Sequence, residues 1–105
     1  MQQQIENVSV AISSLGYGVT QIIFSGDTYP VKDIIRGVGA RWNCVDKVWN
    51  VITGQPETLE ELCGIMRSHI KEIADLGFAF NWEDTDPILR DKAIEIYREL
   101  YPEKV

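Results

Sequence analysis

The chain has 105 residues, of which 45% are hydrophobic and 25% are charged, as in an average folded domain. This length fits one compact domain over residues 1–105 and leaves little room for an elaborate catalytic cleft. No apolar run approaches the ~18 residues of a membrane helix, and the N-terminal Met1-Gln2-Gln3-Gln4 lacks the basic and apolar regions of a secretory signal. We therefore expect a cytoplasmic protein with no membrane segment.

The formal net charge of −6 is unevenly distributed. Residues 1–53 hold four acidic and four basic residues, so the whole acidic excess lies in residues 54–105. Phosphate binding needs a dense surface of Lys and Arg, so this balance disfavours non-specific binding to nucleic acid. It favours a basic partner or simple solubility.

The N-terminal segment, residues 5–15, fits two patterns. Val8, Val10 and Ile12 alternate with small residues, which is the period of a half-buried strand. The segment also places apolar residues at helical spacing, with Gly16 as a C-terminal cap. The density of Val and Ile favours a strand that continues through a turn at Gly16-Tyr17-Gly18 into residues 19–25 as a β-hairpin.

A short helix and a second hairpin are predicted over residues 28–53. Thr28 is expected to cap the helix, with Pro30 in its first turn. The inward face of this helix is expected to carry Val31, Ile34, Ile35 and Val38. Gly37 and Gly39 end it, and residues 41–43 and 48–53 pair across a tight turn. Trp49 alternates in phase with Val51, which predicts a buried structural tryptophan.

Two further helices are predicted in the acidic half, residues 54–105. Thr58 followed by Glu61 forms a capping box before an apolar stripe that runs from Leu59 to Ile73. An aromatic connector, residues 78–82, leads to a last helix that starts at Asp86-Pro87. The expected fold is α+β in the order ββαββαα, with a small, mostly antiparallel sheet covered on one face by the two C-terminal helices.

Catalytic and metal chemistry find no support in the residue pattern. Cys44 and Cys63 lie 19 residues apart without a CxxC motif, so we expect two reduced thiols. His69 is the only histidine and has no partner at ligand or triad spacing. The acidic run at residues 83–86 suits a helix N-terminus better than a metal loop. We expect no enzyme, no cofactor and no metal.

One segment resembles a known family. A short helix is followed by Gly39-Ala40-Arg41-Trp42-Asn43, a tight turn and Lys47-Val48-Trp49-Asn50-Val51. This pattern, over about residues 19–53, resembles the strand-helix-hairpin module of the HepA-related (HARP) domain of annealing helicases, and small modules in phage and plasmid DNA-processing proteins. The resemblance implies a nucleic-acid recognition module with Trp42 and Trp49 as framework aromatics and Asn43 as a turn former. The nucleic-acid contacts that it implies come from Lys32, Arg36, Arg41, Lys47 and the ring of Trp42.

The acidic half points to a different class of function. A small acidic protein built around such a module is typical of phage-encoded inhibitors and accessory factors, including anti-CRISPR and other DNA-mimicking proteins, which dock on the basic surface of a nucleic-acid-binding enzyme. The expected docking residues are acidic and lie in or just before the last helix: Glu83, Asp84, Asp86, Asp91, Glu95 and Glu99. Docking on such a protein is favoured over direct nucleic-acid binding, because the four basic residues of the module are balanced by four acids.

Overall fold

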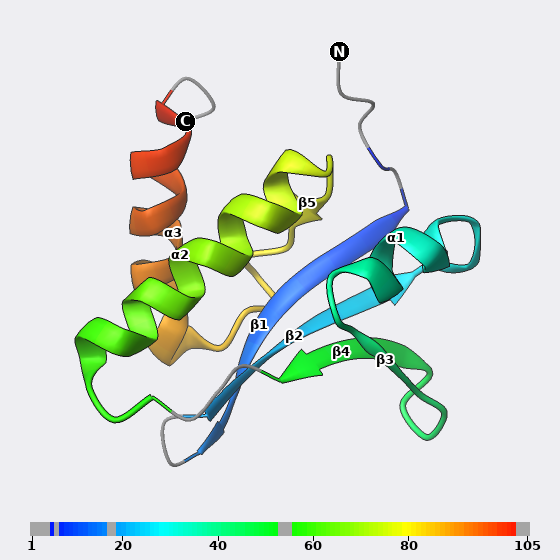
Figure 1. The fold of residues 1–105 in the computed structure, drawn as a ribbon, viewed down its shortest axis with the longest axis horizontal. Coiled ribbons are helices and arrows are strands. Elements are labelled where there is room, and N and C mark those ends of the chain that lie inside the picture. Colours follow the sequence, from blue (N-terminus) through cyan, green and yellow to red (C-terminus); the bar gives the residue numbers. More distant parts are fainter. Residues whose placement is uncertain (1–4, 6, 17–18, 53–55, 103–105) are drawn as a thin grey trace.

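The computed structural model describes residues 5, 7–16, 19–52 and 56–102. Its elements in chain order are strands β1 (Val8–Gly16) and β2 (Val19–Gly26), a 3-10 turn η1 (Tyr29–Val31), helix α1 (Lys32–Gly37), strands β3 (Arg41–Asn43) and β4 (Val48–Ile52), helix α2 (Leu59–Asp75), strand β5 (Ala79–Phe80) and helix α3 (Pro87–Leu100). They form an α+β fold around a five-stranded mixed sheet (Figure 1). The predicted class is confirmed.

The strands lie in the order β3-β4-β2-β1-β5. The pairs β1–β2, β2–β4 and β3–β4 are antiparallel, so the two predicted hairpins are present and residues 8–16 form a strand. Tyr17 and Gly18 of the first turn, and Thr53 after β4, lie outside the described residues. The predicted element order misses β5, which pairs in parallel with β1. A two-residue strand carries no detectable alternation, and its pairing depends on a partner far away in sequence.

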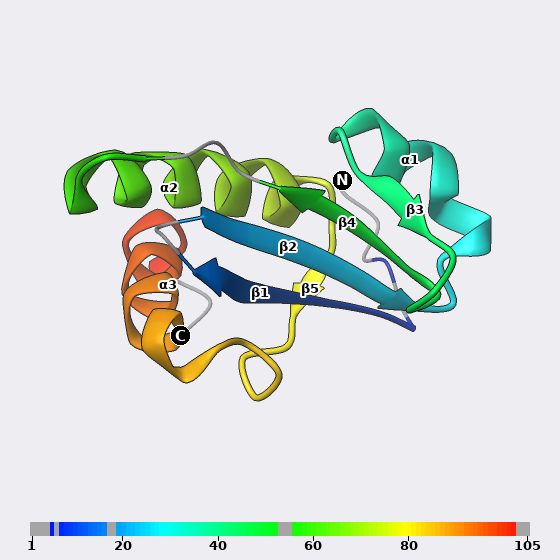
Figure 2. The ribbon, with the colours of Figure 1, turned by 90° about the horizontal axis from the view of Figure 1, so that it is seen from below.

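Helices α1 and α2 lie on the same face of the sheet, whereas α3 lies beside α2 at the end of β1 (Figures 1 and 2). Of the two C-terminal helices predicted to cover the sheet, α2 lies over its face, next to α1. Helix α3 packs against α2 and β1, and its Leu89, Ala93 and Ile96 belong to the core. Ile35 of α1 is fully buried in the core, together with Phe24 of β2 and Trp49 of β4.

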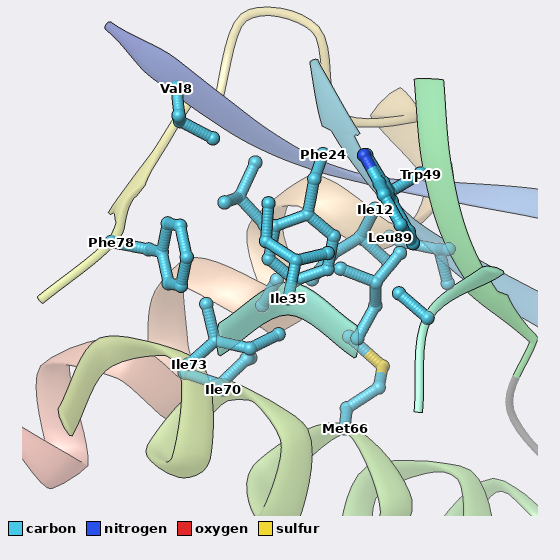
Figure 3. Packing of buried hydrophobic residues seen from close by; sticks show 14 of the residues in the cluster. Val8, Ile12, Phe24, Ile35, Trp49, Met66, Ile70, Ile73, Phe78 and Leu89 are labelled. Atoms are coloured by element: carbon cyan, nitrogen blue, oxygen red, sulfur yellow. The ribbon is translucent and has the colours of Figure 1, made fainter. Parts of the chain in front are cut away.

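The core fills the space between the sheet and the three helices. Phe24 meets Phe78 edge to face with ring centroids 5.2 Å apart, and Ile35, Ile70 and Ile73 pack around them (Figure 3). Trp49 is 8% exposed, which confirms its predicted burial.

Two residues predicted to face inward are exposed instead. Ile34 is 40% exposed and Leu59 is 71% exposed. Ile34 and Ile35 are adjacent in a helix of six residues, so only one of them faces the sheet. Leu59 is the first residue of α2. Cys63 of α2 is half-buried and Cys44 is exposed, and both are free thiols.

Side-chain caps start the two long helices. Thr58 Oγ1 accepts a hydrogen bond from the amide of Glu61 at 3.1 Å, as predicted, but the Glu61 carboxylate accepts from the amide of Glu57 rather than from that of Thr58. Asp86 Oδ1 accepts from the amide of Ile88 at 3.0 Å. Thr28 precedes η1 but makes no side-chain cap, which corrects the third predicted cap.

Candidate functional site

A pair of tryptophans faces the same side of the β3–β4 hairpin. Trp42 stands opposite Trp49, with ring centroids 5.6 Å apart and a 60° tilt. Asn43 closes the hairpin, because its Oδ1 accepts from the amides of Val45 at 3.0 Å and Asp46 at 3.2 Å, which confirms its turn-forming role. Trp49 lies under α1, whereas Trp42, on the edge strand, is 49% exposed.

Two basic side chains of α1 lie over aromatic rings. Lys32 Nζ is 4.2 Å from the centre of the Tyr29 ring, and Arg36 Cζ is 5.6 Å from that of Trp49. Both distances are within the range of cation–π attraction. Arg36 also pairs with Asp33 at 3.7 Å, but both side chains are exposed and such pairs contribute little. The aromatic rings thus hold the two cations side by side on one helical face.

These elements enclose a hollow of about 350 Å³, which we call the aromatic pocket. It is lined by Thr28, Tyr29, Lys32, Arg36, Trp42 and Trp49. Its volume is near the lower end of the range of small-ligand sites. Tyr29 is 74% exposed, so this ring and that of Trp42 offer open aromatic surface. The described lining carries two cations and no carboxylate.

The structure divides the five residues expected to contact nucleic acid. Lys32, Arg36 and Trp42 line the aromatic pocket. Arg41 precedes Trp42 in β3, so its side chain emerges on the opposite face of the sheet. Lys47 is exposed in the β3–β4 turn, where its φ is 58°. Arg41 and Lys47 are therefore not part of this pocket.

The acidic residues expected to dock on a partner fall into two groups. Near the start of α3, Asp86 caps the helix and Asp84 Oδ2 accepts from Asn81 Nδ2 at 2.9 Å. Glu83 is exposed, and its backbone carbonyl accepts from Arg90. Along α3, a second hollow of about 580 Å³ is lined by Asp91, Ile94, Glu95, Arg98 and Glu99. Within this row Glu95 pairs with Lys92 and Glu99 pairs with Arg67 of α2.

The sequence pattern assigns no binding role to Thr28 or Tyr29, and it marks Trp49 only as framework. A signal that could have added Tyr29 to Lys32 and Arg36 is spacing: the three follow one another at three and four residues, which places them on one helical face. The approach of that face to the Trp42–Trp49 pair depends on how α1 packs on the sheet, and no local pattern reports it.

The described residues offer neither a metal cluster nor a membrane helix. Within residues 5, 7–16, 19–52 and 56–102, no three His, Cys, Asp or Glu side chains gather as a metal site would require. No helix in that part of the chain is both long enough and apolar enough to span a bilayer.

Comparisons with protein-family models, with curated proteins and with solved structures find no match to this chain. The resemblance of residues 19–53 to the HARP module therefore rests on its motif alone.

Proposed function

We propose that the protein is a non-enzymatic binding module that holds single-stranded nucleic acid at the aromatic pocket. The observation that carries the proposal is the joint placement of Lys32 and Arg36 beside the open rings of Tyr29 and Trp42. Single-strand binding sites combine the same two parts, because bases stack on aromatic rings and basic groups contact the backbone phosphates.

The cations at the pocket remain available to a ligand. A ring attracts the positive charge of Lys32 or Arg36 through its π-face but accepts few of the N–H groups, so these donors are left for phosphate oxygens. Arg36 has a planar set of donors that matches two phosphate oxygens at once. Trp42 is half exposed beside them and offers a plane for one base.

The net charge of −6 opposes binding to the phosphates of nucleic acid. This repulsion is reduced at the aromatic pocket by the arrangement of the molecule. Helix α3, with its row of carboxylates, lies at the opposite end of the sheet from α1 and β3 (Figure 2). The protein extends 36 × 36 × 23 Å, and the Debye length is about 8 Å at physiological ionic strength. The field of α3 is therefore strongly screened at the pocket.

Fluorescence anisotropy with a labelled single strand and a matched duplex, at two salt concentrations, tests the proposal. We expect salt-sensitive binding of the single strand and weaker binding of the duplex. The variant Lys32→Ala/Arg36→Ala should abolish most of this binding and reduce the salt slope by about 0.7 for each phosphate that the variant no longer neutralises.

The matched control is Arg41→Ala/Lys47→Ala, which removes the same charge outside the aromatic pocket. We expect it to retain most of the affinity, with only a small loss from the changed net charge. An equal loss in the two double variants would show that total charge, and not the pocket, governs binding. No binding of the single strand by the native protein would overturn the proposal.

A second candidate function is docking on a basic protein through α3, as an inhibitor or accessory factor. The observation that favours it is the row of Asp91, Glu95 and Glu99, which are one helical turn apart and border the 580 Å³ hollow. A basic nucleic-acid-binding surface is the complementary partner. Glu95→Lys/Glu99→Lys should then weaken capture of this partner from host lysate, most strongly at low salt, while Lys32→Ala/Arg36→Ala leaves the capture unchanged.

A further inference from the structure

Thr28 is a buried polar residue at the aromatic pocket for which the fold has no evident use. The residue is only 7% exposed and it lines the pocket. Its backbone is held in the turn, since its amide donates to the Gly26 carbonyl at 2.9 Å and its carbonyl accepts from the Val31 amide at 3.1 Å. Its hydroxyl makes no cap of η1 and no other hydrogen bond with the described residues.

The hydroxyl of Thr28 keeps some accessible surface, and the residue lines the aromatic pocket. Within the described part of the chain, no fully buried side-chain oxygen or nitrogen lacks a hydrogen-bond partner. Because the Thr28 hydroxyl has no partner there, the small exposed area of the residue includes this oxygen. A hydroxyl that is almost enclosed and unpaired is costly unless water or a ligand completes its hydrogen bonds.

The pocket therefore combines three chemical features. Tyr29 and Trp42 give open aromatic surface, Lys32 and Arg36 give positive charge, and Thr28 gives a hydroxyl that both donates and accepts. A nucleotide has the three complementary features in one unit: a flat base, a phosphate and a base edge rich in donors and acceptors. A simple phosphate lacks the plane, and an apolar ring lacks the polar edge.

We infer that Thr28 is a recognition residue whose hydroxyl binds the edge of one unpaired base seated in the aromatic pocket. This inference rests on the proposed function and deepens it, since it names the part of the nucleic acid that is read. In a duplex the Watson–Crick edges are paired and the faces are stacked, so the pocket selects single strands. A free nucleotide carries the same chemistry, but the strand supplies additional phosphates.

The test compares Thr28→Val, which removes the hydroxyl and keeps the shape, with Thr28→Ser, which keeps the hydroxyl. Anisotropy is measured with a short labelled single strand and with a strand of equal length that lacks all bases. We expect Thr28→Val to bind the base-bearing strand about threefold to tenfold more weakly, as for the removal of one neutral hydrogen bond. Thr28→Ser should bind it like the native protein.

On the abasic strand, the native protein and Thr28→Val should bind equally weakly. Equal affinity of these two proteins for the base-bearing strand would overturn the role of Thr28 while leaving the proposed function intact. If Thr28→Val loses the same factor in affinity for both strands, Thr28 contacts the sugar-phosphate backbone, and the inference that it binds a base is overturned. If the native protein binds neither strand, the proposed function itself fails.

Two controls complete the experiment. Thermal unfolding of both Thr28 variants establishes that they are folded. If Thr28→Val is unstable, Thr28→Ser still tests the inference, because its affinity for both strands must equal that of the native protein. Adenosine and uridine monophosphates serve as competitors. Displacement of the labelled strand by either one at a lower concentration than by unlabelled strand would assign the pocket to free nucleotides and overturn the polymer as its ligand.

Discussion

The two ends of the sheet hold their charged side chains in different ways. At the η1–α1–β3 end, Lys32 and Arg36 lie over aromatic rings beside an open pocket. Along α2 and α3, basic groups are engaged by oxygens of the protein itself: Arg67 pairs with Glu99, and Lys71 pairs with Asp75 at 2.8 Å. There, Arg90 also donates to the backbone carbonyls of residues 82, 83 and 85.

This difference shows why a charge count is a poor guide to the partner of the protein. Carboxylates that cap helices or pair locally contribute to folding and present less free charge to a partner. Cations held on rings keep their donors available. A chain with a net charge of −6 therefore presents a locally basic, aromatic surface at one end.

The largest expected effect separates the two tryptophans of the pocket. Trp49 is 8% exposed and Trp42 is 49% exposed. Trp49→Ala should reduce the free energy of unfolding by about 3 to 5 kcal/mol, as expected for a buried aromatic residue. Trp42→Ala should reduce it by about 1 kcal/mol or less and yet lose most of the single-strand affinity. Denaturant unfolding and anisotropy measure the two effects, and comparable losses of stability would contradict the division.

The sequence predicts the long periodic elements and the residues that define them. The alternation in β1 and β2 and the stripes of α2 and α3 appear as expected because each repeats over several residues. Strand β5 escapes prediction because its two residues gain their hydrogen bonds from β1, about 70 positions earlier. Local pattern holds no information on such a pairing.

The sequence motif predicts only part of the lining of the aromatic pocket. The motif includes Lys32, Arg36 and Trp42, which the structure brings together. It also includes Arg41, although strand alternation alone sends Arg41 and Trp42 to opposite faces. The local pattern predicts Thr28 as a helix cap, whereas in the structure its side chain makes no cap and the residue lines the pocket.

A medium-sized effect tests whether the carboxylates near the start of α3 serve the fold. Asp86→Ala removes the cap of α3 and should cost about 1 kcal/mol of stability. Asp91→Ala, at an exposed position on the same helix, is the matched control and should change stability by less than about 0.5 kcal/mol. Neither variant should alter single-strand binding. Equal stability of the two variants in denaturant unfolding would remove the structural role assigned to Asp86.

A smaller effect concerns the contact between the two long helices. The Tyr101 hydroxyl donates to Asp75, and burial, followed by this hydrogen bond and the charge of Asp75, raises the pKa of Tyr101 from 10.0 to about 12. A pKa that is higher in the folded state means that the contribution of the group is complete below pH 10 and is lost as the pH rises from 10 towards 12.

Comparison of the native protein with Tyr101→Phe isolates this contribution. The native protein should be more stable by about 1 kcal/mol at neutral pH, the net value of a hydrogen bond, and the difference should decline only above pH 10. Denaturant unfolding of both proteins between neutral pH and pH 12 measures it, and the other tyrosines titrate equally in the two. A difference that declines below pH 9 would assign the pH dependence to another group.

The smallest expected effect tests how independent the two ends are. Glu95→Lys/Glu99→Lys changes the net charge from −6 to −2 and places a lysine beside Arg67, so a modest loss of stability is expected. If the acidic row is screened from the aromatic pocket, single-strand affinity at physiological salt should rise by less than about twofold, with a larger rise at low salt, where the Debye length is about 30 Å. Anisotropy at both salt concentrations measures the single-strand affinity, and Lys32→Ala/Arg36→Ala, measured in parallel, shows the size of a large change in affinity. A large rise at physiological salt would mean that the carboxylates of α3 act directly on the ligand, and that the two ends of the sheet form one electrostatic surface.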